Sequence, residues 1–463
     1  MNMSKITRRD FIKRVGMGAA VAGTASLVGC DSPASSASSS ESALPDIPTD
    51  KMTYRRNPGT GAEVSILGYG CMRWPMKPKA DGEGEELDQE QINRLVDTAI
   101  AHGVNYFDTS PVYCQGQSEH ATGIALSRHD RSKYQIATKL SNFSPDAQTY
   151  EGSVRMYRNS FKELQVDYID YLLLHAIGGN IEDFNRRFVD NGIMDFLKAE
   201  KEAGRIRNLG FSFHGQQSVF DQLMQFHDEG TYHWDFVQIQ MNYLDWLHAG
   251  VQSKYLYDEL TRRNIPVVIM EPLLGGRLSK VNDHIFREMK SREPERTAAS
   301  WAFRFCGTKE NVMTVLSGMT FMEHLEDNLR TFCPLAALSD EELEFLEQMA
   351  VEILTYPTIP CTGCQYCMPC PYGLDIPGIF AHYNKCVNDG MMPASAQDQE
   401  YARLRKAFLV GYDRSVPRLR QADHCVGCRQ CVEHCPQHID IPQQMDRIDE
   451  FVEKLKQGKS VTE

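Results

Sequence analysis

The stretch YIDYLLLH at residues 168–175 carries the pattern that decides the fold. Four consecutive apolar residues, Tyr171 to Leu174, are what a strand buried on both faces requires. Seven more short apolar runs alternate with helical patterns, at residues 65–70, 104–109, 135–140, 206–213, 236–242, 266–271 and 312–318. Eight strands with intervening helices over about 250 residues are typical of a (β/α)8 barrel, a closed α/β fold.

A doubly wound open sheet is the alternative for the same alternation of strands and helices. No GxGxxG fingerprint follows the first predicted strand, and this disfavours a dinucleotide-binding fold of that kind. We therefore expect a barrel over residues 51–335.

Polar residues lie where three of these strands end. Asp108, Lys139 and His175 are at or next to the carboxyl ends of the second, third and fourth predicted strands, and Tyr113 follows Asp108 by five residues. Active sites of such barrels are built at this end, so the four side chains should converge. A tyrosine has a free pKa of about 10. A neighbouring ammonium would lower that pKa, an aspartate would hold the ammonium, and the histidine would orient a substrate carbonyl.

Motifs along this region resemble those of the aldo/keto reductase family and occur in the same order, from about residue 52 to residue 332. They are Gly68-Tyr69-Gly70-Cys71-Met72, Asn105-Tyr106-Phe107-Asp108-Thr109-Ser110 with Tyr113, Gly116-Gln117-Ser118-Glu119, Ala137-Thr138-Lys139, Leu173-Leu174-His175, Val237-Gln238, and Ser317-Gly318 with Leu325-Glu326-Asp327-Asn328. The resemblance implies a (β/α)8 barrel that uses NAD(P)H to reduce a small carbonyl substrate, or NAD(P)+ to oxidise an alcohol. It implies that Tyr113 is the general acid, that Lys139 and Asp108 tune it, and that His175 orients the carbonyl.

The same resemblance implies a nicotinamide nucleotide site, at Ser212, Gln238, Met270, Ser317, Gly318, His324, Asp327 and Asn328. The chain departs from the family at three of its positions. Ser212-Phe213 replaces the Ser-Asn that holds the carboxamide, Met270 replaces an aromatic residue that stacks on the nicotinamide, and His324 replaces an arginine that contacts a 2′-phosphate. These departures leave the choice between NAD and NADP open.

The region 336–463 contains two cysteine motifs and should form a small, mainly helical ferredoxin-type domain. Ser339 with Glu342 forms a capping box that predicts a helix to about residue 354. The motifs that follow are Cys361-x2-Cys364-x2-Cys367-x2-Cys370-Pro and Cys425-x2-Cys428-x2-Cys431-x3-Cys435-Pro. The second is the bacterial ferredoxin run, and the first is one residue short before its last cysteine.

The residues from the last cysteine of each motif onward also match, since both read Cys-Pro-x-x-x-Asp-Ile-Pro. Such an internal repeat predicts a two-cluster module. In two-cluster ferredoxins the fourth cysteine ligates the other cluster. One [4Fe-4S] cluster would then use Cys361, Cys364, Cys367 and Cys435, and the other Cys425, Cys428, Cys431 and Cys370. More than fifty residues separate the motifs, which resembles the helical ferredoxin modules of larger respiratory enzymes.

Two alternatives remain for these cysteines. The first is that they form disulfides, but cysteines three apart and followed by Cys-Pro make a poor disulfide framework. Zinc held by paired CxxC motifs is the other alternative. If the shortened first motif is degenerate, the module holds one cluster instead of two.

The N-terminus has the features of an export signal. Residues 7–14 read TRRDFIKR and precede a small-residue apolar stretch that ends in Leu27-Val28-Gly29-Cys30, a pattern typical of a signal peptide. Arg8-Arg9 resembles a twin-arginine signal and the final four residues resemble a lipobox. The expected organisation is a signal peptide at 1–29, a lipidated Cys30 and a Ser-rich tether at 30–50. The alternative is a basic tail on a buried helix.

Charge narrows the range of partners. The net charge is −13, and because residues 1–29 carry +4, the remainder carries −17. Such an acidic chain disfavours nucleic acid as a partner. The sequence predicts an exported, lipid-anchored oxidoreductase on the extracytoplasmic face of the membrane that exchanges electrons with a membrane or periplasmic partner. A hydride carries two electrons and a cubane passes one, so a flavin that converts between the two remains an alternative. The rival interpretation is a non-catalytic barrel that serves as an electron-transfer or interaction protein.

Overall fold

The computed structural model describes residues 47–248 and 250–461. The predicted signal peptide, Cys30 and most of the Ser-rich tether lie outside the described residues. Within the described ranges, no helix combines the length and apolar character needed to cross a membrane.

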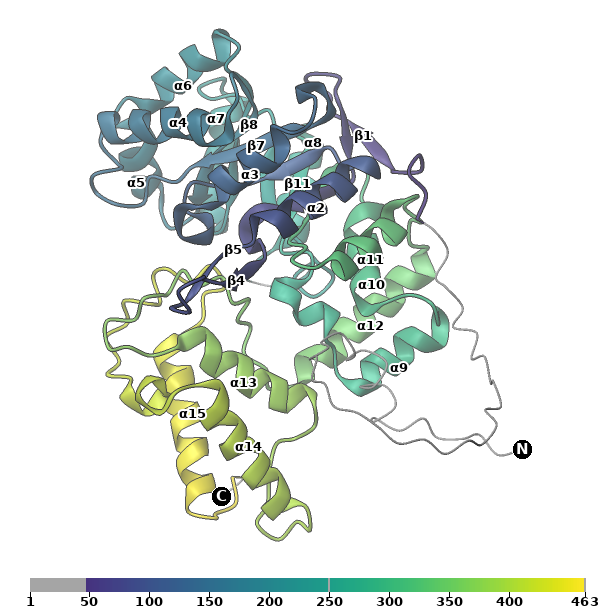
Figure 1. Cartoon of the computed structure of the whole chain (residues 1–463), viewed down its shortest axis with the longest axis vertical. Helices are drawn as coiled ribbons and strands as arrows, with labels where there is room; N and C mark the ends of the chain where they lie inside the picture. Colours follow the sequence, from purple (N-terminus) through teal and green to yellow (C-terminus); the bar gives the residue numbers. More distant parts are fainter. Residues whose placement is uncertain (1–46, 249, 462–463) are drawn as a thin grey trace, which may run out of the picture. The chain divides into compact units, whose positions relative to one another are not determined.

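Eight parallel strands close into a barrel (Figure 1). They are β3 (Leu67–Gly70), β6 (Tyr106–Asp108), β7 (Gln135–Leu140), β8 (Ile169–Ile177), β9 (Ile206–Phe213), β10 (Val237–Gln240), β11 (Val267–Met270) and β12 (Val312–Ser317). Each coincides with one of the eight apolar runs. Neighbouring strands pair in chain order, and β12 returns to pair with β3, with Leu316 opposite Gly68. The predicted (β/α)8 barrel is confirmed, and the open-sheet alternative is wrong.

The barrel interior is packed with large side chains. Nine fully or almost fully buried residues form one cluster inside it, namely Val64, Tyr106, Ala137, Tyr171, Leu173, Phe236, Val268, Met313 and Leu316. Their neighbours along the strands face outward and pack beneath the helices, which explains why runs such as Tyr171 to Leu174 are apolar on consecutive residues.

Helices connect successive strands and cover the outside of the barrel (Figure 1). They are α2 (Gln89–Ala101), α3 (Ser118–Leu126), α4 (Tyr150–Leu164), α5 (Ile181–Phe184), α6 (Ile193–Glu202), α7 (Gln217–Asp228), α8 (Ser253–Arg262), α9 (Asp283–Arg292), α10 (Ala298–Thr308) and α11 (Met322–Phe332).

Two short hairpins were not predicted. The first, β1 (Tyr54–Arg56) with β2 (Glu63–Ser65), closes the amino end of the barrel. There the buried Asn57 donates to Tyr171 Oη at 3.0 Å and to Asn208 Oδ1 at 3.3 Å. The second hairpin pairs β4 (Met76–Pro78) with β5 (Glu85–Leu87).

Helix α12 (Asp340–Thr355) follows the barrel and confirms the predicted capping box. Ser339 Oγ accepts from the Glu342 amide, while Glu342 Oε2 accepts from the Ser339 amide at 2.8 Å.

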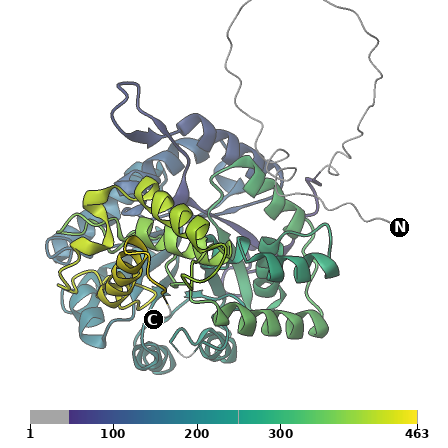
Figure 2. The same cartoon turned by 90° about the horizontal axis from the view of Figure 1, so that it is seen from below.

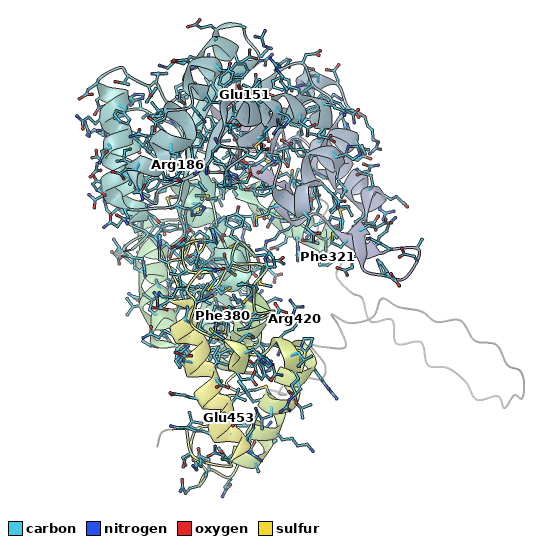
Figure 3. The ribbon with its side chains drawn as sticks, turned by 90° about the vertical axis from the view of Figure 1, so that its left-hand side faces the viewer. Glu151, Arg186, Phe321, Phe380, Arg420 and Glu453 are labelled. Atoms are coloured by element: carbon cyan, nitrogen blue, oxygen red, sulfur yellow. The ribbon has the colours of Figure 1, made fainter. Side chains whose placement is uncertain are left out.

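The C-terminal module contains α13 (Ile376–Asn388), α14 (Tyr401–Ser415) and α15 (Ile441–Lys456), with α14 packed against both others (Figures 1 and 2). Its core includes Phe380, which is labelled in Figure 3. The repeated Asp-Ile-Pro starts a helix in both places. Asp375 and Asp440 are the N-caps of α13 and α15, and a proline lies in the first turn of each helix.

Candidate active site

The four predicted catalytic side chains meet at the carboxyl ends of β6, β7 and β8. Lys139 Nζ lies 2.5 Å from Asp108 Oδ1 and 2.8 Å from the carbonyl oxygen of Thr109, and the lysine and aspartate are both buried. The ring centroid of Tyr113 lies 4.9 Å from Lys139 Nζ. It also lies 5.8 Å from the His175 ring, edge to face. The arrangement can present a phenol and an imidazole to one substrate oxygen.

Tyr113 is held in its protonated form. Burial raises its pKa well above the usual 10.0, Asp108 raises it further, and side-chain hydrogen bonding to Tyr366 opposes the rise. The pKa of Tyr113 is thus raised, where a lowered value was expected, and the Lys139 ammonium donates to Asp108 and to the Thr109 carbonyl oxygen. Tyr113 therefore carries a proton across the neutral pH range, as a general acid must.

His175 is held neutral and in a fixed orientation. Burial lowers its pKa well below 6.5, and the positive charges of Lys139 and Arg187 lower it further. Ser141 Oγ lies 2.6 Å from His175 Nδ1. When Nδ1 accepts from that hydroxyl, Nε2–H is the donor that can face a carbonyl oxygen. The exposed ring of Phe143 lies 5.1 Å from the imidazole and forms part of the wall of the mouth.

Ser141 and Arg187 are not among the predicted site residues. Ser141 lies two positions beyond Lys139, and a polar residue next to the end of that strand is a signal that could have identified it. Arg187 donates to the carbonyl oxygen of His175 at 2.6 Å from a short helical turn, Asn185–Val189, that lies twelve residues further along the chain. No local pattern marks such a contact.

Three of the residues assigned to the nucleotide lie across the mouth, in β9, β10 and β11. Ser212 is buried and its hydroxyl accepts from the amide of Ala176 at 2.8 Å. Gln238 donates to Asp108 Oδ2 at 3.3 Å. Met270 is the last residue of β11. The two polar side chains thus already bind to the protein itself.

The other five lie beside β12 and α11. Asn328 donates to Ser317 Oγ at 2.9 Å, and Asp327 accepts from the threonine that caps α10 at 2.7 Å. Only Gly318 and His324 among these five are exposed. Most of the side chains that the resemblance assigns to the nucleotide are therefore engaged within the chain.

The eight motif thiols form two separate groups. In one group, three thiols of the first motif interact electrostatically with the last cysteine of the second motif. The three are Cys361, Cys364 and Cys367, and the fourth is Cys435. In the other, the same exchange joins Cys425, Cys428 and Cys431 to Cys370. The structure thus brings together the two sets that the exchange pattern predicts. We call them the first and second thiol sets.

The donor chemistry of both sets fits an iron–sulfur cubane. Four cysteine thiolates are the ligand set of a [4Fe-4S] cluster. The thirteen cysteines of the described residues are all free, and Cys386 is buried in the core of the module.

The module contacts the carboxyl end of the barrel. The hydrogen bonds that join them include Arg73 to the Thr362 carbonyl oxygen at 2.8 Å, Arg277 to Thr358 Oγ1 at 2.9 Å, and Gln240 with Gln437 at 3.0 and 3.2 Å. Tyr366, between two cysteines of the first set, interacts with Tyr113. Cysteine spacing does not show which way this tyrosine faces, so sequence reasoning missed it.

Comparison with known proteins agrees with this architecture. Residues 66–350 match the model of the Aldo/keto reductase family, and residues 360–439 match that of the 4Fe-4S dicluster domain. The chain is 25% identical over 339 residues to L-galactose dehydrogenase of Arabidopsis thaliana, covering 66% of this chain and 98% of that protein.

Solved structures share the barrel. An aldo-keto reductase from Bacillus halodurans in its holo form has a TM-score of 0.52 at 22% identity, covering 64% of this chain and 96% of its own. An aldo-keto reductase from Klebsiella pneumoniae in complex with NADPH has a TM-score of 0.50 at 21% identity, covering 63% and 93%. Because the family model spans more than half of its length, the chain belongs to the aldo/keto reductase family of oxidoreductases.

Proposed function

We propose that this protein interconverts a small carbonyl substrate and its alcohol at Tyr113 and exchanges the electrons through two [4Fe-4S] clusters. The observation that carries the proposal is the position of the first thiol set. Tyr366, one residue before Cys367, interacts both with Tyr113 and with Cys364. An iron–sulfur centre would thus lie next to the acid that serves the substrate.

At the barrel, the substrate carbonyl would accept hydrogen bonds from Tyr113 and from His175 Nε2. Reduction adds two electrons and two protons, and Tyr113 delivers the proton that the oxygen receives. The buried pair of Lys139 and Asp108 holds the tyrosine in place. The 4Fe-4S domain and the NADPH complex of the Klebsiella relative support iron–sulfur clusters and NAD(P)H as cofactors. Bound NAD(P)H would supply a hydride, which is two electrons and a proton; two clusters can supply the two electrons, one each, and the proton would come from solvent.

The second thiol set lies at the surface, where a partner can reach it. Cys428 is exposed, whereas the four thiols of the first set are partly buried. Three exposed hydrophobic side chains lie in the segments that carry the second set, namely Tyr372, Leu419 and Val426. Arg420, labelled in Figure 3, donates to the carbonyl oxygen of Gly373 in the same area. We infer that a membrane or periplasmic electron carrier docks here.

The test is a redox assay on anaerobically purified protein. The clusters are reduced with dithionite, the excess is removed, and aldehydes and ketones are added while the cluster absorbance is followed. Reoxidation by a carbonyl that stops in Tyr113→Phe supports the enzyme. If no carbonyl oxidises the reduced clusters and no alcohol reduces the oxidised ones, the rival electron-transfer interpretation is correct.

We also propose export by the twin-arginine route and a lipid anchor at Cys30. The proposal rests on the Arg8-Arg9 pair and on the four residues that end at Cys30. Replacing both arginines with lysine should retain the protein inside the cell. Replacing Cys30 with alanine should release an exported protein from the membrane fraction. A membrane-bound, exported protein in both variants would contradict this proposal.

A further inference from the structure

The segment from residue 358 to residue 366 links the barrel to the first cysteine motif and lies on the side of the mouth where the nucleotide is expected. It is fixed at three points: Thr358 accepts from Arg277, Thr362 accepts from Arg73, and Tyr366 interacts with Tyr113. The contacts run from the loop after β11 to the centre of the tetrad.

Gly275 shows how closely this segment packs on the loop after β11. A Cβ at Gly275 would lie 2.3 Å from the Thr362 carbonyl oxygen and 2.4 Å from the Thr362 Cα. These atoms belong to the backbone and cannot turn away, and Gly275 also has a positive φ of 66°. The cradle that the glycine leaves open is therefore filled by the chain itself.

Arg73 covers the neighbouring strand end. Its Cδ would lie 3.3 Å from a Cβ at Gly318, and its guanidinium reaches the Thr362 carbonyl oxygen. Thr362 therefore packs on the loop after β11, and Arg73 lies against Gly318 directly after β12. A dinucleotide that extends from Met270 to His324 would have to cross both.

We propose that the 358–366 segment and NAD(P)H occupy the same part of the barrel mouth, so that the nucleotide binds only when this segment is displaced. The inference rests on the proposed function, which supplies the nucleotide. Displacement would also move the loop that carries Cys361 and Cys364. Linkage is reciprocal, so nucleotide binding must affect the first cluster as strongly as the docked segment affects the nucleotide.

The test measures NADPH binding to the iron-loaded full chain by nucleotide fluorescence. Tyr366→Ala removes the side chain that reaches Tyr113, and Arg73→Ala removes the anchor of Thr362 from outside the module. Each should lower the dissociation constant for NADPH by about tenfold or more, because the 358–366 segment is displaced in a larger fraction of molecules. In the wild type, NADPH should also alter the EPR signal of the first cluster.

Two variants serve as matched controls. Tyr372 lies two residues after Cys370, as Tyr366 lies two residues after Cys364, but its side chain is 51% exposed. Arg420 donates to a backbone carbonyl within the module, as Arg73 does across the mouth. Tyr372→Ala and Arg420→Ala should leave the affinity for NADPH unchanged.

Iron content, measured in each variant, shows whether the clusters are intact. If Tyr366→Ala loses iron, Arg73→Ala decides the question. Equal affinity in wild type and Arg73→Ala, or no NADPH binding by either, overturns the inference. Reoxidation of reduced clusters by a carbonyl once NADP+ is added, and its loss in Tyr113→Phe, tests the proposed function separately from the comparison of the two affinities, so the two can fail independently.

Discussion

At the scale of single residues, the site depends on keeping a tyrosine neutral and a histidine uncharged. Burial acts in opposite directions on the two, since it raises the pKa of a phenol and lowers that of an imidazole. Tyr113 thus keeps its proton and His175 remains without a second one. The buried ion pair of Lys139 and Asp108 lies between them as a fixed dipole.

Replacing Tyr113 with phenylalanine should lower the rate of carbonyl reduction by about 10²- to 10⁴-fold, the usual contribution of a general acid. The ring and its packing would remain. The measurement is carbonyl-dependent reoxidation of reduced clusters. Tyr150→Phe, which changes an exposed tyrosine of α4, is the control and should be fully active. A Tyr113→Phe enzyme with normal turnover would exclude this residue as the acid.

The reduction rate should be independent of pH from about pH 7 to about pH 9. The pKa of Tyr113 is raised well above 10.0 and that of His175 is lowered well below 6.5, so neither group titrates in this interval. Glu119, whose pKa burial raises to about 7, hydrogen-bonds to Thr138 behind Lys139. A change of the reduction rate near pH 7 that disappears in Glu119→Gln would belong to that residue. A change of the rate that persists in Glu119→Gln would show that Tyr113 or His175 ionises between pH 7 and pH 9.

At the scale of secondary structure, helix ends hold the C-terminal region together. The N-caps Asp375 and Asp440 begin α13 and α15 directly after the two cysteine motifs, so each ligand loop leads into a helix with a defined start. The repeat in sequence is therefore a repeat of loop and cap. Helix α12 begins in the same way at its capping box.

Replacing Ser339 with alanine should lower the free energy of unfolding by about 1 kcal/mol, the usual effect of losing an N-cap hydroxyl. The amide of Glu342 loses its acceptor, and only the bond from the amide of residue 339 to the Glu342 carboxylate remains. Urea denaturation followed by circular dichroism measures the change. Ser291→Ala, near the end of α9, removes a hydroxyl that caps no helix start and should have less than half this effect. Equal effects of the two substitutions would show that the box contributes no stability.

At the scale of the whole molecule, each thiol set contains cysteines of both motifs, and this grouping ties the module into one unit. Each thiol set takes three cysteines from one motif and one from the other. The second motif therefore contributes to both sets. Its last cysteine, Cys435, lies with the first set next to the barrel, whereas its loop Cys425–Cys428 is at the surface.

Pairs of substitutions test this exchange by iron content, which should be about eight in the wild type if both cubanes form. Cys361→Ser with Cys435→Ser removes two ligands of one cluster and should leave about four irons. Cys425→Ser with Cys435→Ser removes one ligand from each cluster and should leave almost none. The reverse result, about four irons in the second pair and almost none in the first, would mean that each motif binds its own cluster.

The sequence by itself determined the barrel, the tetrad and the two cysteine motifs. The strand pattern of residues 168–175 and its seven counterparts predicted all eight barrel strands, because burial on both faces requires consecutive apolar residues. Asp108, Lys139 and His175 could be grouped because parallel strands end at the same face. These inferences work because they depend on neighbours along the chain.

Three features came from the tertiary structure alone: the module lies against the barrel mouth, Tyr366 interacts with Tyr113, and burial raises the pKa of Tyr113. Each of these depends on segments hundreds of residues apart in the chain, such as Arg73 and Thr362. Desolvation is a property of everything that packs around a group, and no spacing of residues encodes it.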